Sequence, residues 1–83
     1  MRKVVWKFKY DGAIEMPKGA KILTAEFQGT TLMLWALVDP AKKPETRMFE
    51  LYATGQTFEA EDKRYVTTVY QATLVWHLFE IGA

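Results

Sequence analysis

The chain has 83 residues, of which 49% are hydrophobic, and its 11 basic and 10 acidic residues leave a net charge of +1. This balance excludes a strongly cationic arm, so we expect long nucleic acid not to be a partner. The absence of cysteine and the single histidine exclude a disulfide framework and the usual structural zinc sites. We expect one small β domain over residues 1–83, stabilised by an aromatic core and by homo-oligomer formation.

The first predicted element is a strand from Val4 to Tyr10 with a strict two-residue period. Its aromatic residues, Trp6 among them, are expected to point into the core, away from Lys7 and Lys9 on the other face. Lysines on an outermost strand prevent pairing with other chains, which is one interpretation of this basic face. The alternative is a surface that binds an anion through Lys7 and Lys9.

Short strands and turns follow in order. Ala13 to Met16 is a return strand, and Ala20 to Gln28 is a strand whose imperfect alternation indicates a bulge or burial on both faces. Thr31 to Val38 is apolar on both faces and is expected to be the central strand. Its apolar run from Leu32 is about a third of a membrane-spanning helix, so we expect no membrane partner.

The second half of the chain continues the pattern. Asp39 to Glu45 is an expected exposed loop, because its prolines and lysines suit neither strand nor helix. A strand is expected over Thr46 to Thr54. A long connection follows over Gly55 to Arg64, in which Glu59 to Arg64 could form one helical turn. The chain ends in a hairpin of Tyr65 to Thr73 and Leu74 to Glu80, which turns near Gln71-Ala72-Thr73. The predicted fold class is all-β: a small antiparallel sandwich or barrel of six to seven strands.

The residue inventory argues against an enzyme. A nucleophile needs an activating base, and His77 is the only imidazole, with no serine or cysteine in the chain to pair with it. His77 shares a strand face with Val75 and Phe79, where it is either a hydrogen-bonded structural residue or a ligand contact. The glycines stand singly at turns, so no phosphate-binding glycine loop is present and no cofactor is expected.

One acidic group invites a metal hypothesis. Glu59, Glu61 and Asp62 lie close together in the long connection, beside Lys63 and Arg64. A hard-cation site is one interpretation, but their spacing matches no calcium loop, and a solvated loop is the better interpretation. We therefore predict no metal site and no catalytic residue.

Arg47 is the strongest candidate for ligand binding. It shares a face with Phe49 and Leu51, and an arginine on an apolar face needs a carboxylate, a carbonyl oxygen or a ligand anion as its partner. For Trp35, core packing competes with a ligand contact. If the ligand is a nucleotide, Arg47 or the lysine face is expected to meet phosphate and an aromatic ring to stack on the base. The candidate residues are Arg47, Trp35, Tyr52, His77, Lys7 and Lys9.

Several segments of the chain look familiar. They are Ile14 to Leu23 (IEMPKGAKIL), Leu34 to Pro40 (LWALVDP), Thr46-Arg47, Thr54-Gly55 and Leu74 to Glu80 (LVWHLFE). Together they resemble a family of small proteins encoded by tailed bacteriophages and prophages and classed as a domain of unknown function. The resemblance covers nearly the whole chain in order, and none of its segments is a catalytic signature.

The resemblance implies a phage-encoded, non-enzymatic binding protein in the host cytoplasm. We expect a counter-defence factor that sequesters a host nucleotide signal, in its sharpest form between the subunits of an oligomer. Two alternatives stay open: an inhibitor or scaffold that binds a host or phage protein through a strand edge, and a minor virion component.

Overall fold

The computed structural model describes residues 2–82, which form seven strands and no helix. Within that range no helix is therefore long and apolar enough to cross a membrane. The strands are β1 (Val4–Lys9), β2 (Ala13–Pro17), β3 (Lys21–Gln28), β4 (Thr31–Val38), β5 (Pro44–Ala53), β6 (Lys63–Gln71) and β7 (Leu74–Ile81).

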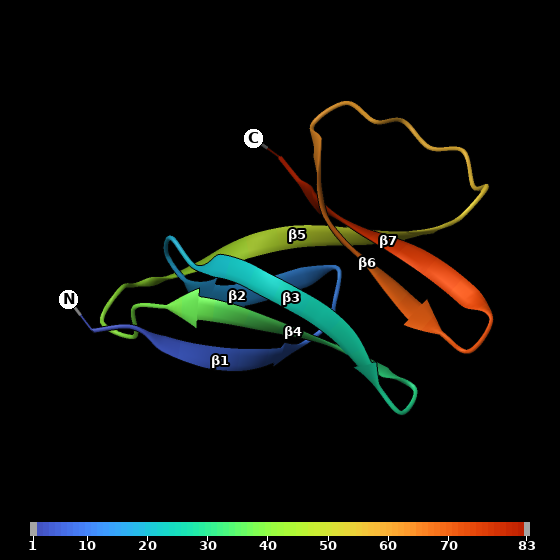
Figure 1. Ribbon diagram of the computed structural model, residues 1–83. Coiled ribbons are helices and arrows are strands. Elements are labelled where there is room, and N and C mark those ends of the chain that lie inside the picture. The colour runs from blue at the N-terminus through green and yellow to red at the C-terminus, as the bar shows by residue number, and fades with distance from the viewer. Residues whose placement is uncertain (1, 83) are drawn as a thin grey trace.

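The strands form two antiparallel sheets (Figure 1). One has three strands in the order β1-β4-β3, and the other has four in the order β2-β5-β7-β6. The sheets face each other as a small sandwich, and β3 and β6 contact each other where the layers meet. The predicted all-β fold class is confirmed, in its sandwich form, with seven strands.

Strand β4 supplies the centre of the core. Leu32, Leu34, Ala36 and Val38 alternate toward the other sheet and are at most 4% exposed. The residues between them are only partly buried, because they lie on the outer face of the three-stranded sheet. The four-stranded sheet contributes Met16, Phe49 and Leu78 to the same core, and each of these side chains is at most 1% exposed. The predicted central position of Thr31–Val38 is confirmed.

The irregular alternation of β3 has the predicted cause. The pairing of β3 with β4 shifts between Ile22 and Thr24, so Leu23 is an extra residue in a β-bulge. Leu23 is 48% exposed. Ile22 and Ala25 are an odd number of positions apart, so a regular strand would place them on opposite faces. The bulge keeps both on the core side.

The expected burial of the first strand is wrong for Trp6. Its side chain is 41% exposed, and Val4 on the same face is 40% exposed. The reason is the strand order: β1 is the outermost strand of its sheet and is hydrogen-bonded only to β4. The other sheet covers β4 and leaves much of the inner face of β1 open.

Two predicted boundaries also need correction. Pro44 and Glu45 belong to β5 rather than to the preceding loop, because Pro44 stands opposite Pro17 at the first position of a strand, where a missing N–H is tolerated. Strand β6 begins at Lys63, which shortens the long connection. That connection contains no helical turn among the described residues.

The terminal hairpin turns at Ala72 and Thr73, as predicted, and Ala72 has a φ of +52°. This left-handed conformation is costly for any residue with a Cβ atom. Replacing Ala72 by glycine should therefore raise the free energy of unfolding by about 0.5 kcal/mol, after the greater freedom of glycine in the unfolded chain is allowed for. Urea unfolding measures the change. The matched control, Ala13→Gly in β2, should destabilise by a similar amount, and destabilisation by both would contradict the argument.

Candidate anion-binding site

Arg47 lies in β5 on the inner face of the four-stranded sheet, and its guanidinium is almost enclosed. Its Nε donates to Oε2 of Glu80 at 2.6 Å, and its Nη2 donates to Oε1 at 2.9 Å. A third donor, Nη1, donates to the backbone carbonyl of Ala20, the residue just before β3. The side chains of Arg47 and Glu80 are 13% and 9% exposed. Arg47 thus has the carboxylate and carbonyl partners that its apolar face requires, and a ligand role for it stays a prediction.

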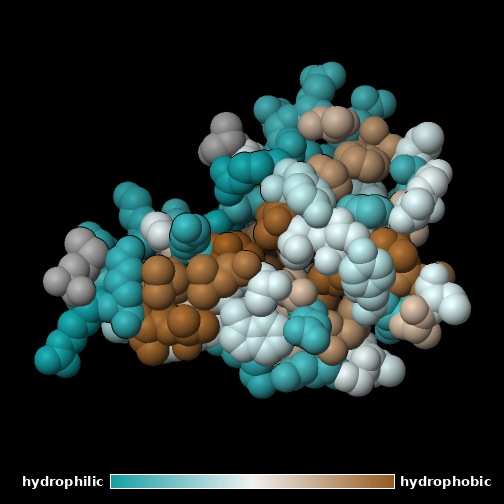
Figure 2. Space-filling view, in the orientation of Figure 1, coloured by the Kyte–Doolittle hydropathy of each residue, from teal (hydrophilic) through white to brown (hydrophobic). Residues whose placement is uncertain are grey.

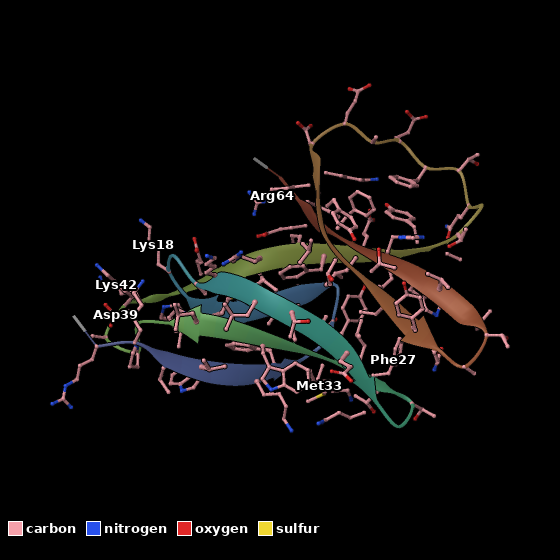
Figure 3. The ribbon with its side chains drawn as sticks, in the orientation of Figure 1. Lys18, Phe27, Met33, Asp39, Lys42 and Arg64 are labelled. Atoms are coloured by element: carbon pink, nitrogen blue, oxygen red, sulfur yellow. The ribbon has the colours of Figure 1, made fainter. Side chains whose placement is uncertain are left out.

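Arg64 is the second cation at this carboxylate. It stands directly opposite Glu80 in the pairing of β6 with β7, and its Nη2 donates to Oε1 of Glu80 at 2.6 Å. Unlike Arg47, its side chain is 65% exposed. Figure 3 shows Arg64 at the start of β6, beside the end of β7. Most of its guanidinium N–H groups are consequently free to bind a molecule arriving from solvent.

A bulge places Arg64 there. The pairing of β6 with β7 shifts between Tyr65 and Thr67, so Val66 is the extra residue. An uninterrupted hairpin would put Tyr65 opposite Glu80, on the inner face. With the bulge, Arg64 takes that place and Tyr65 turns to the outer face opposite Phe79.

The three charges stabilise one another. Hydrogen bonding to Arg47 lowers the pKa of the Glu80 carboxyl below its ordinary value, against the effect of burial, and the charge of Arg64 adds to the lowering. The hydrogen bond to Glu80 in turn raises the pKa of Arg47. At neutral pH all three groups are ionised, and the cluster of Arg47, Arg64 and Glu80 carries one net positive charge.

Two hollows open on either side of this cluster, which we call the arginine site. The first, of about 330 Å³, is lined by the start of β5 and the end of β7 and includes Glu45. The second, of about 310 Å³, is lined by the start of β3 and by β6, and it includes Lys21, Ile22 and Val66. The two arginines of the arginine site give the second hollow two cations against one carboxylate. Its size is at the small end of the range for ligand pockets.

Lys7, Lys9 and Trp35 lie elsewhere, on the outer face of the three-stranded sheet. Lys7 pairs with Trp35 across β1 and β4, and Lys9 pairs with Met33. The ammonium of Lys7 lies 3.3 Å from Oε1 of Gln28 on β3. The structure therefore brings these candidates to one another but not to Arg47.

Tyr52 and His77 are cross-strand neighbours on the outer face of the other sheet. The imidazole is held at both nitrogens, by Thr54 Oγ1 at 2.8 Å and by Thr68 Oγ1 at 3.1 Å. The ring of Tyr52 is stacked on Phe58, with centroids 3.9 Å apart and planes inclined by 6°. The structural interpretation of His77 matches these contacts, and the stacking face of Tyr52 is occupied by the chain's own Phe58.

Phe58 explains how the long connection is held against this face. Its ring also meets Phe79 edge-on at 5.1 Å. Beside it, Lys63 donates to the hydroxyl of Tyr52 at 2.8 Å and pairs with Glu50 at 3.2 Å. The hydrogen bond from Tyr52 lowers the pKa of Glu50, and the bond to Tyr52 raises the pKa of Lys63. The cluster fixes the loop and leaves its acidic residues in solvent.

No metal-ligating group of three or more histidine, aspartate or glutamate side chains occurs within residues 2–82. Glu59, Glu61 and Asp62 are all exposed there. Asp62 has a φ of +58°, and its carbonyl accepts a hydrogen bond of 2.7 Å from the N–H of Gly82. It therefore holds the end of the loop to the end of β7.

Two residues of the arginine site were missed from the sequence. A signal existed for Glu80, because it shares a face of the last strand with Trp76 and Leu78 and is the carboxylate that Arg47 needs. For Arg64 the sequence offers no such signal, since its position depends on the bulge at Val66.

Comparison with known proteins gives a family and no function. No curated protein and no solved structure matches the chain. One family model, described as a domain of unknown function, DUF7352, matches residues 1–82. The match covers all seven strands and the whole arginine site, and the chain therefore belongs to the DUF7352 family.

Proposed function

We propose that this protein is a non-enzymatic binding domain for a small phosphate-bearing ligand, and that the ligand docks at the arginine site. The observation that carries the proposal is the pairing of a buried arginine with an exposed one. Arg47 and Glu80 form a largely buried ion pair, and Arg64 presents free N–H groups beside two hollows. A guanidinium is planar and binds phosphate oxygens through paired hydrogen bonds, which suits this arrangement.

The second hollow is the better place for the ligand. Arg47 and Arg64 outweigh the single carboxylate of Glu80 there, whereas Glu45 balances the charges in the first hollow. Ile22 and Val66 add apolar surface to the same wall. A molecule with a phosphate at one end and a flat, largely apolar group at the other fits this lining, and a nucleotide has that composition.

A biological role follows from the resemblance to small proteins of tailed bacteriophages. Such a protein, made in the host cytoplasm, counteracts host defence by sequestering a nucleotide signal. A small, stable domain that holds a nucleotide without converting it is sufficient for this task. Binding without turnover also agrees with a chain that has no serine, no cysteine and one hydrogen-bonded histidine.

Arg64→Gln tests the proposal. The side chain is mostly exposed, so the variant should fold normally and lose a charge-assisted contact, weakening binding by about tenfold or more. Isothermal titration calorimetry with inorganic phosphate, a mononucleotide, a cyclic mononucleotide and a cyclic dinucleotide identifies the ligand class. Lys9→Gln, on the distant outer face, is the control and should bind as the wild type does. Binding of none of these probes at millimolar concentration, or equal binding by Arg64→Gln, would show the proposal to be wrong.

A second function is favoured by one specific observation, the open edge of β1. Its inner face exposes Val4 and Trp6 by 40% and 41%, and no strand pairs with its outer edge in the described structure. An extended segment of another protein could add to this edge and cover both side chains. Capture of one partner from host lysate by wild type and Arg64→Gln alike, with no nucleotide bound by either, would favour this function.

A further inference from the structure

The outer face of the three-stranded sheet is apolar along its middle. Its side chains come from alternate positions of β1 and β4 and from the bulge of β3. They are Val5, Leu23, Met33, Trp35 and Leu37. Val5 is 50% and Leu23 is 48% exposed. Figure 2 shows hydrophobic side chains gathered over this sheet, and Met33 is labelled in Figure 3.

The charges on this face are arranged in rows across the strands. Lys7 stands beside Trp35, and Lys21 stands beside Leu37. In the third row, Lys9 stands beside Met33 in the pairing of β1 with β4, and Glu26 stands beside Met33 in the pairing of β3 with β4. The two side chains are therefore separated by two strand spacings, roughly 10 Å. Within the described residues neither forms an ion pair. A cation and a carboxylate thus flank the apolar middle without satisfying each other.

We propose that a second copy of this chain packs against this outer face, with a two-fold axis running along β4 between the two sheets. This rotation exchanges the positions of β1 and β3 between the two copies, and each row of paired residues stays at the same point along β4. Strand β1 of one copy then lies over β3 of the other. Lys9 meets the partner's Glu26, and Glu26 meets the partner's Lys9, while Trp35 meets the partner's Trp35 at the centre.

The charges select this axis over its alternative. A two-fold axis at right angles to β4 would lay β1 over the partner's β1 in the opposite direction, which brings Lys7 against the partner's Lys7 or the partner's Lys9. Like charges across an interface are strongly unfavourable. The axis along β4 pairs opposite charges, and it is compatible with the aligned packing, about 10 Å apart, of sheets in sandwiches.

The size of the face sets the expected strength. Three strands of about eight residues cover roughly 14 Å by 26 Å, which is small for a stable interface. The dimer should therefore be a reversible one that forms at micromolar or higher protein concentration. Nothing in this interface depends on the arginine site, so its test is independent of the proposed function.

Charge exchange tests the geometry. Sedimentation equilibrium should show that Lys9→Glu and Glu26→Lys each weaken wild-type dimerisation by about tenfold, since each creates two like-charge contacts. The double variant, with the charges exchanged, should restore the affinity. Lys18→Glu, in an exposed turn, and Arg64→Gln are controls that should dimerise as the wild type does.

A second measurement does not depend on variants. Dilution of the wild-type protein followed by NMR should shift the indole signal of Trp35 and leave that of Trp76 unchanged. A monomer at millimolar concentration, single variants that dimerise normally, or a double variant no better than either single would each overturn the proposal.

Discussion

Replacing Glu80 by glutamine is expected to lower the free energy of unfolding by about 3 kcal/mol, because it leaves the charge of Arg47 buried without its counter-charge. Glutamine keeps the size and one acceptor of the side chain, so the loss reports the charge rather than the packing. Arg64 loses its carboxylate partner at little cost, since its side chain is already 65% exposed to solvent. Urea unfolding at pH 7 measures the difference.

Glu15→Gln is the matched control for this prediction. Glu15 is exposed in β2 and has no ion-pair partner within the described residues, so its replacement should change stability by less than about 0.5 kcal/mol. Equal effects of the two substitutions would contradict a structural role for the buried pair.

The same variant should alter the response to acid. The pKa of Glu80 is lower in the folded protein than in the unfolded chain, chiefly through its hydrogen bonds to Arg47. The stabilisation is therefore fully present above the ordinary value of 4.5 and is lost as the pH falls from there through the folded-state pKa. Between pH 7 and pH 3 the wild type should lose more stability than Glu80→Gln. Parallel curves would show that Glu80 is not the group responsible.

Phe49→Ala is expected to have the largest effect on folding. The ring is 1% exposed between the sheets, and its removal loses buried apolar surface and leaves a cavity, at a cost of about 4 kcal/mol. A domain of this size has little stability to spare, so much of the variant should be unfolded at 37 °C. Thermal unfolding followed by circular dichroism measures this.

Phe58→Ala is the control for the Phe49→Ala prediction. Its ring stacks on Tyr52, but it is 37% exposed and belongs to a loop. Its removal should cost about 1 kcal/mol and loosen the connection between β5 and β6 without unfolding the sandwich. A cost as large as that of Phe49→Ala would mean that the loop, rather than the inner face, holds the fold together.

Much of the fold follows from the alternation of side chains. The period-two pattern predicts the strands, the apolar run predicts β4 at the centre of its sheet, and Gln71-Ala72-Thr73 predicts the last turn. The exposure of Trp6 could not be predicted, because it depends on how far the opposite sheet extends over β1. The predicted loop wrongly included Pro44, because a proline usually ends a strand but is tolerated at its first position.

The site was predictable only in part. The need of Arg47 for a carboxylate or an anion follows from its neighbours Phe49 and Leu51. That Arg64 joins it does not, because bulges are set by the packing of the whole sheet rather than by local sequence. Trp35, Tyr52 and His77 were named as candidates for stacking, and the structure spreads them over two outer faces far from the arginine site.

The bulge at Val66 has a consequence for aligning relatives. Because Val66 is the extra residue, a homologue one residue shorter at that point would keep its arginine opposite the glutamate through an uninterrupted hairpin. A homologue of equal length but without the bulge would place a tyrosine there instead. Sequence position alone is therefore a poor guide to which relatives share the second arginine. A gap at Val66 in an alignment does not indicate that this arginine has moved away from the glutamate.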